Sequence, residues 1–424
     1  MNKTIALQTF GCKVNQYESE VLREQMRLGG YRIVPMDQVA DVYLINSCSV
    51  TADADSSCRQ LMRKILRERP ASRLVVTGCY AERDPEALRA ISPRVEVFGN
   101  REKPLIAIAL GVPTACVEEA AKIGVVELAE RTRAYIKVQD GCDAHCTYCI
   151  IPRVRPDLVC REPHLILHEA RQLIQGGYKE IVLTGVRLGR YLWSNPYAFE
   201  TWDLARLVKG LVDLPGDFRV RLSSLEVTEI GSPLIALMRE HPKLCPHFHI
   251  PLQSGDDAIL KRMGRWYTAT DYRDQIREIK ARVPDVALSA DVIVGFPGED
   301  DGHFQNTARL LDEEGFSRLH VFRYSVRPGT PAVRLHRQVD PRVKSARARA
   351  LVELDWVLRR RYAGRFLDRP LKVLQESDGG YTERYVRVRS ASGVPEGRFH
   401  TVRPTQVTPE GILVEKVANT SHSG

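Results

Sequence analysis

Three cysteines within eight residues form the pattern in this sequence with the clearest chemical meaning. Cys142, Cys146 and Cys149 follow the spacing C-x3-C-x2-C, directly after an apolar run that is expected to form a strand. Three thiolates at this spacing can hold one cubane iron-sulfur cluster and leave its fourth iron open to a substrate. A zinc site with His145 as the fourth ligand is the alternative, although zinc sites more often consist of two spaced pairs.

Three further cysteines each stand just after a predicted strand. With the apolar runs that precede them, they are Cys12 after 5–9, Cys48 after 42–46 and Cys79 after 74–77. The carboxyl ends of neighbouring parallel strands meet at one edge of a sheet, and ligands bind at that edge. These cysteines are therefore candidates for a second site.

The chain has ten cysteines, and in a reducing compartment they are not expected to form disulfides. Four of them lack a usable spacing and are expected to be buried free thiols. These are Cys58, Cys116, Cys160 and Cys245. Cys160 lies near the C-x3-C-x2-C loop, where a spare ligand or a sulfur-handling thiol is the alternative.

Two series of alternating strands and helices are expected to position the cysteines. Residues 1 to about 110 alternate apolar runs with helical patterns, which predicts a parallel sheet covered on both faces. Six strand-helix units follow, which predicts a partial (β/α)6 barrel with its chemistry at the carboxyl ends of the strands. Their expected strands are 134–138, 180–184, 218–223, 248–251, 287–294 and 318–322.

A helix near 341–361 is expected to end the barrel, and the short alternating runs after it predict a small β-barrel. The expected fold class is therefore α/β with three units. Their expected bounds are 1–115, 130–362 and 363–420.

Composition indicates a soluble chain with a moderately basic surface. Lys and Arg number 62 against 53 Asp and Glu, which gives a net charge of +9. No apolar run reaches the about 18 residues of a membrane-spanning helix, and the start lacks the features of a secretory signal. We therefore expect a cytoplasmic protein without membrane association. Ten Arg or Lys against three acids lie between Arg334 and Arg365, which suits a solvated helix face and an RNA-contacting surface equally.

The C-x3-C-x2-C loop, with aromatic Tyr148 before its last cysteine, resembles the signature of the radical S-adenosylmethionine (radical SAM) superfamily. The resemblance implies that SAM chelates the open iron and that an electron from the cluster cleaves it to a 5′-deoxyadenosyl radical. Polar or glycine-rich ends of later strands fit the SAM pocket of such enzymes, since glycines permit close approach of a nucleoside. With Tyr148, the candidate cofactor-binding residues are Thr184, Gly185, Ser223, Ser224, Glu226, Gln253, Asp291, Ile293 and Gly295.

The second set of cysteines indicates which family within the radical SAM superfamily the sequence resembles. Segments 9–16, 46–48 and 77–79 resemble the N-terminal domain of the methylthiotransferases, and segment 380–385 looks like the RNA-binding TRAM barrel of that family. The resemblance covers nearly the whole chain. The run Thr-Phe-Gly-Cys-Lys-Val-Asn-Gln at 9–16 is most similar to the MtaB branch, which modifies N6-threonylcarbamoyladenosine beside the anticodon of tRNA.

This resemblance implies two 4Fe-4S clusters with different tasks. Cys142, Cys146 and Cys149 serve to generate a radical that removes hydrogen from C2 of adenine, because an unactivated ring C–H offers nothing to a side-chain acid or base. Cys12, Cys48 and Cys79 hold a sulfur-delivering cluster, and a second SAM supplies the methyl group. The implied partners are a tRNA anticodon stem-loop and an electron donor of flavodoxin or ferredoxin type, and a monomer is expected.

Two alternatives stay open. The first keeps the enzyme class with another target, either isopentenyladenosine in tRNA or a ribosomal protein residue. The second is an RNA-binding iron-sulfur paralogue that has lost catalysis. Departures from the family pattern leave the substrate less certain than the radical step; they are Pro156 for glycine, Cys160 for serine, Arg187 for asparagine and Val227 for proline.

Overall fold

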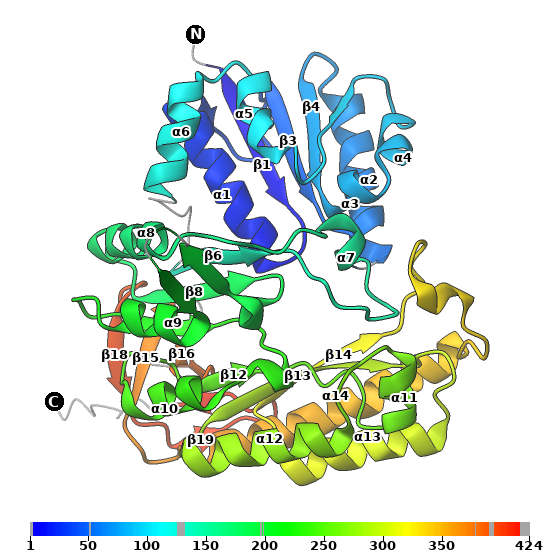
Figure 1. The fold of residues 1–424 in the computed structure, drawn as a ribbon, viewed down its shortest axis with the longest axis vertical. Coiled ribbons are helices and arrows are strands. Elements are labelled where there is room, and N and C mark those ends of the chain that lie inside the picture. Colours follow the sequence, from blue (N-terminus) through cyan, green and yellow to red (C-terminus); the bar gives the residue numbers. More distant parts are fainter. Residues whose placement is uncertain are drawn as a thin grey trace, which may run out of the picture.

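The protein has an N-terminal unit, a central curved wall of strands and a C-terminal sheet (Figure 1). The computed structural model describes residues 3–50, 52–124, 132–195, 197, 199–377, 379–389 and 394–415. Within these residues no helix is both long and apolar enough to cross a membrane. The expected α/β class is confirmed, whereas the domain bounds stay a prediction because residues 1–2, 130 and 416–420 lie outside the described part.

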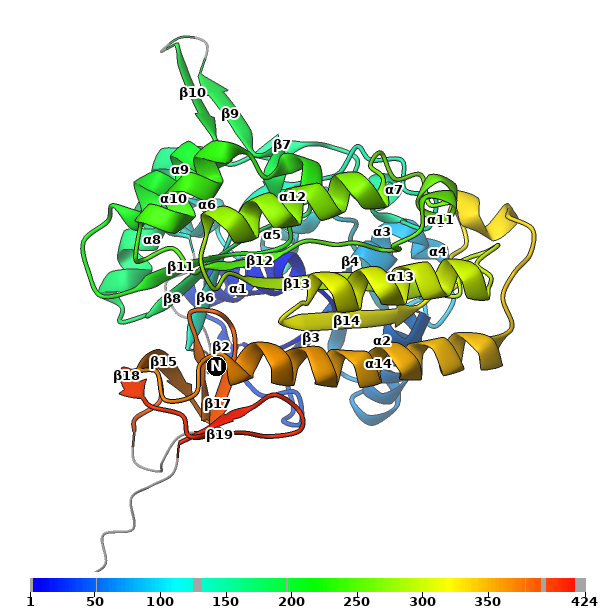
Figure 2. The same cartoon turned by 90° about the horizontal axis from the view of Figure 1, so that it is seen from below.

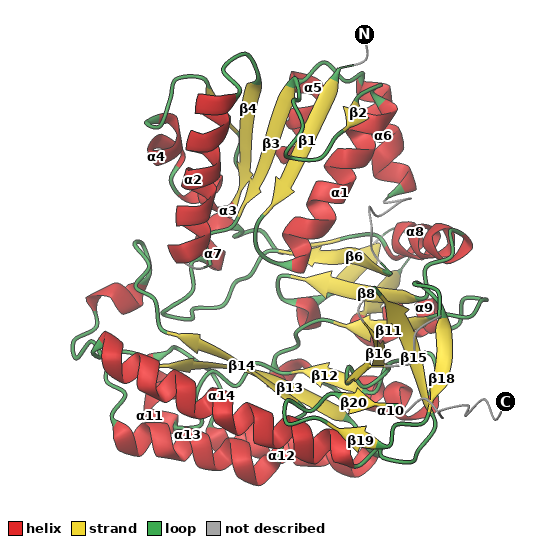
Figure 3. Ribbon diagram, turned by 180° about the vertical axis from the view of Figure 1, so that it is seen from behind, coloured by secondary structure: helices red, strands yellow, loops and turns green. Residues whose placement is uncertain are grey.

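The N-terminal unit is a parallel five-stranded sheet in the order β2-β1-β3-β4-β5. The strands are β1 (Thr4–Thr9), β2 (Arg32–Ile33), β3 (Val42–Ser47), β4 (Arg73–Gly78) and β5 (Val95–Val97). One face carries α1 (Lys13–Leu28), α5 (Ile106–Ala109) and α6 (Thr114–Ile123), and the other carries α2 (Ala52–Glu68), α3 (Cys79–Arg83) and α4 (Pro85–Arg89) (Figure 3). Successive side chains of a strand point to opposite faces, so Leu44 packs on the α1 side and Ile45 on the α2 side. The predicted sheet with two covered faces is confirmed.

All six strands predicted for the barrel are present. They are β6 (Arg133–Asp140), β8 (Glu180–Gly185), β11 (Arg219–Leu222), β12 (His247–His249), β13 (Ala287–Val294) and β14 (Arg318–Arg323). They form two sheets, β7-β6-β8-β11 and β12-β13-β14, which single parallel bridges connect at Val220–Leu244 and Ser224–His249. The result is an open wall with β14 at one edge.

Helices cover the outer face of this wall (Figure 2). They are α8 (Pro163–Gln175), α9 (Leu204–Val212), α10 (Ser232–Glu240), α11 (Asp257–Arg262), α12 (Ala269–Arg282) and α13 (Asp301–Glu314). Sequence analysis did not predict the short β7 (Val159–Cys160), which runs antiparallel to β6, or the projecting hairpin of β9 (Leu192–Asn195) and β10 (Glu200–Asp203).

The C-terminal sheet follows the long helix α14 (Pro341–Gly364). Its order is β18 (Phe399–Val402), β15 (Leu371–Glu376), β16 (Gly379–Thr382), β17 (Arg387–Arg389), β20 (Leu413–Val414) and β19 (Gln406–Val407). The turn after β16 carries Tyr385 to the barrel, where Arg133 Nη1 donates to its hydroxyl at 2.9 Å and the Arg221 guanidinium lies 4.6 Å from its ring centre. The predicted β structure is therefore present and docks on the amino ends of β6 and β11.

Glu18 of α1 joins the N-terminal unit to the barrel. Its carboxylate pairs with Lys103 of its own unit, and across the seam it accepts from Lys137 Nζ and Arg155 Nη2, both at 2.8 Å. Glu18, Lys103 and Arg155 are all buried. Burial alone raises the pKa of Glu18, but the three cations hold it well below its ordinary value. The seam is therefore a buried charge cluster centred on Glu18, in which Asp140 also pairs with Lys137 and Arg155, both at 2.8 Å.

Replacing Glu18 by glutamine is expected to destabilise the protein by about 3–5 kcal/mol, because Lys103 then stays buried without a carboxylate and Lys137 and Arg155 keep only Asp140. Denaturant unfolding at pH 7 measures this loss. The exposed Glu86, which pairs with Arg89 at 2.7 Å on the same helix, gives the control Glu86→Gln, with an expected loss below about 1 kcal/mol. Equal losses in the two variants would contradict the assignment.

Candidate active site

The C-x3-C-x2-C loop is held by backbone contacts from several segments. Gly141 has φ +79°, and a Cβ there would lie 1.9 Å from the carbonyl oxygen of Asp157, so the chain can pass only with glycine at this position. The amide of Cys142 donates to the Arg155 carbonyl at 3.0 Å, and that of Thr147 donates to the Met263 carbonyl at 2.8 Å. The loop is thus fixed before any ligand binds.

The three thiols of this loop lie in a desolvated site beside one cation. Arg265 Nη1 donates to Cys146 Sγ at 3.2 Å, and the amide of Ala144 donates to Cys142 Sγ at 3.5 Å. Burial raises the pKa of the Cys149 thiol to about 12 and also raises that of Cys142. Thiols in such surroundings become thiolates when a metal compensates their charge, which fits a cluster site.

The zinc alternative finds no support at this loop. His145 is exposed, and in the described part of the chain no three His, Cys, Asp or Glu side chains come close enough to hold one metal ion. The thiolates that hold a cubane bind different iron atoms, so they stand farther apart than the ligands of a single ion. The choice between a cubane and a zinc ion at this loop stays a prediction.

The candidate SAM residues lie along one rim of the barrel. Thr184 and Gly185 end β8, Ser223 and Ser224 follow β11, and isolated parallel bridges join Ser224 to His249 and Gln253 to Val292. The Ser223 hydroxyl is buried without a hydrogen-bond partner. Such an unsatisfied buried group is costly and fits a polar ligand at this position.

Other predicted pocket residues have protein partners. Glu226 pairs with Arg265, and Asp291 accepts from His249 Nε2 at 3.1 Å inside the barrel. Tyr148 lies edge-to-face on Phe296 with ring centres 6.4 Å apart. A Cβ on Gly295 would lie 2.3 Å from Lys344 Cγ, so this glycine makes room for α14. Ile293 lies on β13.

The second set of cysteines meets at the carboxyl ends of β1, β3 and β4, which are neighbours in the sheet. Cys12 precedes α1, and Cys79 begins α3. Gly11 has φ +97°, and a Cβ there would lie 2.6 Å from Cys48 Sγ. Burial raises the pKa of Cys48 to about 11 and also raises that of Cys12. A metal cluster would compensate the charge of thiolates at this edge of the sheet, so these three cysteines fit a second cluster site.

The two sets of cysteines face each other across the seam. Cys79 packs against Ile150, the residue after Cys149, and against Val154 of α7 (Ile151–Val154). The side-chain amide of Asn100 donates to the Val154 carbonyl at 2.9 Å. The structure thus brings the candidate ligand sets of two separate units next to each other at the seam.

The remaining four cysteines lie outside the two candidate ligand sets and contact other parts of the fold. Cys58 is a buried residue of α2 and Cys245 is buried near β12, while Cys116 is half-buried and donates to the Leu28 carbonyl at 3.6 Å. Cys160 is half-buried on β7, where its sulfur accepts from the amide of Leu192 at 3.3 Å.

Arg187, one of the departures from the family pattern, bridges two elements at the rim. Its Nη1 donates to Asp143 of the cluster loop and its Nε donates to Glu229, both at 2.6 Å. The sequence pattern did not identify Arg265 and Asn100 as site residues, because each is distant from its cysteine in the chain and belongs to no motif. Arg155 lies in the segment after the third cysteine, but its proximity to Cys12 depends on the fold.

Two family models match the chain: "Uncharacterized protein family UPF0004" at residues 4–99 and the Radical SAM superfamily at residues 136–311. The chain is 38% identical to threonylcarbamoyladenosine tRNA methylthiotransferase MtaB of Thermotoga maritima, over 97% of this chain and 96% of that one. The enzyme of the same name from Bacillus subtilis is 37% identical, over 91% and 90%. A tRNA-2-methylthio-N(6)-dimethylallyladenosine synthase of Anaplasma marginale is 30% identical, over 97% and 91%.

Solved structures support the same fold. The radical SAM methyltransferase TsrM of Kitasatospora setae, with cobalamin and a 4Fe-4S cluster bound, matches with a TM-score of 0.56 over 78% of this chain and 77% of that one. Its identity of 15% supports the fold alone. The curated relatives, by contrast, match over 91–97% of this chain at 30% identity or more. The chain therefore belongs to the radical SAM methylthiotransferase family.

Proposed function

We propose that this protein is a tRNA methylthiotransferase that converts N6-threonylcarbamoyladenosine at position 37 to its 2-methylthio derivative. The curated relatives of that activity are 34–38% identical to the chain, against 30% and 33% for those named for dimethylallyladenosine. The observation that carries the choice of substrate is an unpaired lysine at the polar interior of the barrel, because an anionic modification needs such a partner.

The two sets of cysteines divide the work in this proposal. Cys142, Cys146 and Cys149 hold the cluster that binds SAM, and Cys12, Cys48 and Cys79 hold the second cluster. With SAM bound, the first site supplies a 5′-deoxyadenosyl radical that removes hydrogen from C2 of adenine, and the second site supplies the sulfur. Tyr148 and the polar rim residues hold SAM, and no side chain has to act as an acid or base.

The interior of the barrel is polar and rich in charge. His249 Nδ1 lies 2.9 Å from Ser289 Oγ, and its ring centre lies 5.2 Å from that of His320. Arg221 Nε donates to Glu180 at 2.8 Å. An isopentenyl group is a hydrocarbon and has no group that could form a hydrogen bond in such polar surroundings, whereas a threonylcarbamoyl group offers hydroxyl, amide and carboxylate oxygens.

Lys13, directly after Cys12, supplies a cation without a carboxylate partner. Burial lowers the pKa of its amine, as do Arg221 and Arg133, whereas Tyr385 and Glu180 raise it. The amine has no ion pair or hydrogen bond with the described residues. Arg221 and Arg133 are already paired with Glu180 and Glu376. Lys13 is therefore the cation that remains available for the threonyl carboxylate, next to the second cluster.

Replacing Lys13 by glutamine is expected to raise the KM for tRNA that carries threonylcarbamoyladenosine by about 10- to 100-fold, because a hydrogen bond to a charged group is lost. Steady-state kinetics of the reconstituted enzyme measure this, with iron content as a check on Cys12. The exposed Lys209, paired with Asp213 at 2.6 Å, gives the control Lys209→Gln, which should leave KM unchanged. An unchanged KM in Lys13→Gln would remove this residue from substrate binding.

Mass spectrometry of tRNA nucleosides from a deletion strain tests the proposed function. We expect 2-methylthio-N6-threonylcarbamoyladenosine to disappear and to return with the wild-type gene. Loss of the 2-methylthio form of isopentenyladenosine instead, or of a modification on a ribosomal protein, would assign the protein to another target. Normal levels of all three would favour the paralogue without catalysis.

We further propose a cytoplasmic monomer that receives electrons from a flavodoxin or ferredoxin and reads the anticodon stem-loop. The three proposed units, at 1–115, 130–362 and 363–420, correspond to the second cluster site, the radical SAM barrel and a TRAM-like RNA-binding sheet. Analytical ultracentrifugation and reduction assays with the purified electron carriers test these assignments.

A further inference from the structure

The basic segment between Arg334 and Arg365 contains two kinds of cation. One kind is used inside the fold: Arg347 pairs with Glu299 and Asp301 at 2.7 Å, and Arg359 pairs with Asp355 at 2.6 Å. The other kind is exposed and has no ion pair among the described residues. Its members are Arg334, Arg337, Arg342, Arg349 and Arg360.

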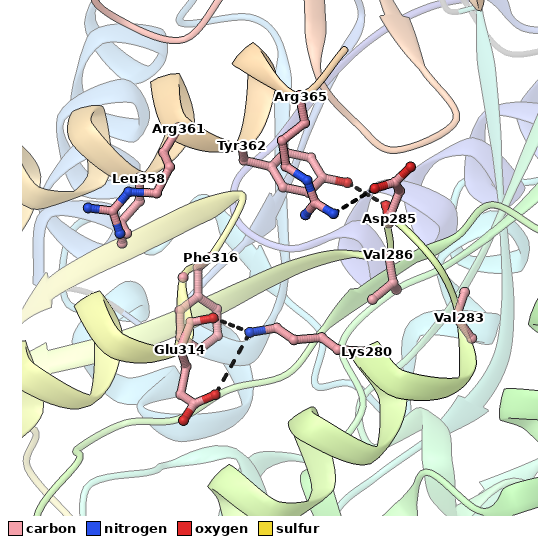
Figure 4. A pocket seen from close by; sticks show the side chains of 11 residues that line it. Lys280, Val283, Asp285, Val286, Glu314, Phe316, Leu358, Arg361, Tyr362 and Arg365 are labelled. Carbon is pink, nitrogen blue, oxygen red and sulfur yellow. Dashed lines mark hydrogen bonds and ion pairs between the residues drawn. The ribbon is translucent and has the colours of Figure 1, made fainter.

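The cations in the C-terminal half of α14 form ion pairs with other parts of the fold. Figure 4 shows a pocket of about 230 Å³ beneath this half, in which Arg365 reaches Asp285 and Lys280 reaches Glu314. Arg365 lies 2.6 Å from the Asp285 carboxylate, and Arg361 pairs with Asp312 at 3.1 Å. The cations on this side of the helix therefore hold the fold together.

The other side of α14 borders a groove with unpaired cations. A cavity of about 510 Å³ lies between α14 and the end of β14. It is lined by Arg323, Ser345, Ala348, Arg349, Val352, Glu353 and Trp356. The Trp356 side chain is 48% exposed, and its indole makes no hydrogen bond with the described residues. The groove thus combines a free aromatic face with two guanidinium groups and one carboxylate.

This groove starts at the mouth of the barrel. Arg323 pairs in register with Val294, and Phe322 pairs with Ile293, one of the candidate SAM residues. β14 is the edge strand of its sheet, and α14 begins beside the carboxyl end of β14 (Figures 2 and 3). A chain that enters the barrel past this edge would pass the groove.

We propose that this groove, lined by Arg323, Arg349 and Trp356, binds a single-stranded segment of the tRNA substrate, and this inference rests on the proposed function. Arg323 and Arg349 contact phosphates, and Trp356 stacks on an unpaired base. Single-stranded RNA is bound by this combination, because stacking on aromatic rings tolerates any base and guanidinium groups neutralise the backbone. An acidic protein would use the cations but would leave no comparable role for the exposed indole.

Equilibrium binding of holoenzyme to tRNA at several salt concentrations tests the inference. Trp356→Ala should weaken binding by about 5- to 150-fold with an unchanged salt slope, because a stacked base is lost and no phosphate contact is lost. Arg349→Gln should weaken binding and reduce the salt slope by about 0.7–1, the share of one phosphate contact. Arg361→Gln, on the paired side of the same helix, is the matched control and should bind as the wild type does.

Cleavage of SAM without tRNA shows that the variants keep an intact active site, and it should be unchanged in all of them. Wild-type affinity in both Trp356→Ala and Arg349→Gln would overturn the inference. It would also be overturned if the variants lose binding to an acidic flavodoxin, or change the sedimentation of the protein, while they bind tRNA normally. A wild-type enzyme that binds no tRNA would overturn the proposed function itself.

Discussion

Replacing Cys142 by alanine is expected to abolish SAM cleavage and to leave about four of the about eight irons per polypeptide that two cubanes contribute. The cluster that binds SAM has three thiolate ligands in this proposal, and loss of one removes the open iron together with the cluster. Even partners outside the ligand sphere cost about 10- to 100-fold when they are removed, so loss of a ligand should lower activity below about 1% of wild type. Formation of 5′-deoxyadenosine after anaerobic reconstitution measures the effect.

The matched control for this variant is Cys116→Ala, because Cys116 is half-buried and far from both candidate sites in the sequence. It should keep full iron content and full cleavage. Zinc in place of iron in the anaerobic wild-type protein, or an iron content that Cys142→Ala does not change, would contradict the assignment of this loop.

Replacing Cys12 by alanine is expected to separate the two halves of the reaction. The radical site stays complete, so 5′-deoxyadenosine still forms, but the sulfur-delivering site loses a ligand and methylthiolated tRNA falls below detection. Iron content again drops to about four per polypeptide. Cleavage and product are measured in the same reaction by mass spectrometry.

The Cys12→Ala variant also shows whether methylthiolation needs the N-terminal cysteines in addition to SAM cleavage at the first site. If Cys12→Ala lost cleavage as completely as Cys142→Ala, the two sites would not be independent. If it kept methylthiolation, the N-terminal cysteines would be structural, and the proposal for the second cluster would be wrong.

Sequence analysis predicted the elements that carry the cysteines, because apolar periodicity and glycine positions are local signals. The helix expected near 341–361 corresponds to α14, and the strand expected at 287–294 coincides with β13. The roles of the six cysteines and of the SAM residues stay predictions, although the structure brings each set together.

Contacts between units could not be predicted, because they join residues that no motif links. The Glu18 cluster joins α1 to a lysine of β6 and to Arg155, 137 residues away. Arg265 reaches Cys146 across 119 residues. The hairpin of β9 and β10 was also missed, since its strands have four residues each and lack a long alternating run. Each of these depends on tertiary packing rather than on local preference.

The contact of Cys79 with Ile150 has a mechanical consequence for catalysis. Ile150 is one peptide bond from Cys149, so a hinge motion between the two units must open an apolar contact before it can change the spacing of their cofactors. Packed interiors resist such deformation. The contact between Cys79 and Ile150 therefore favours a fixed spacing between the two sets of cysteines.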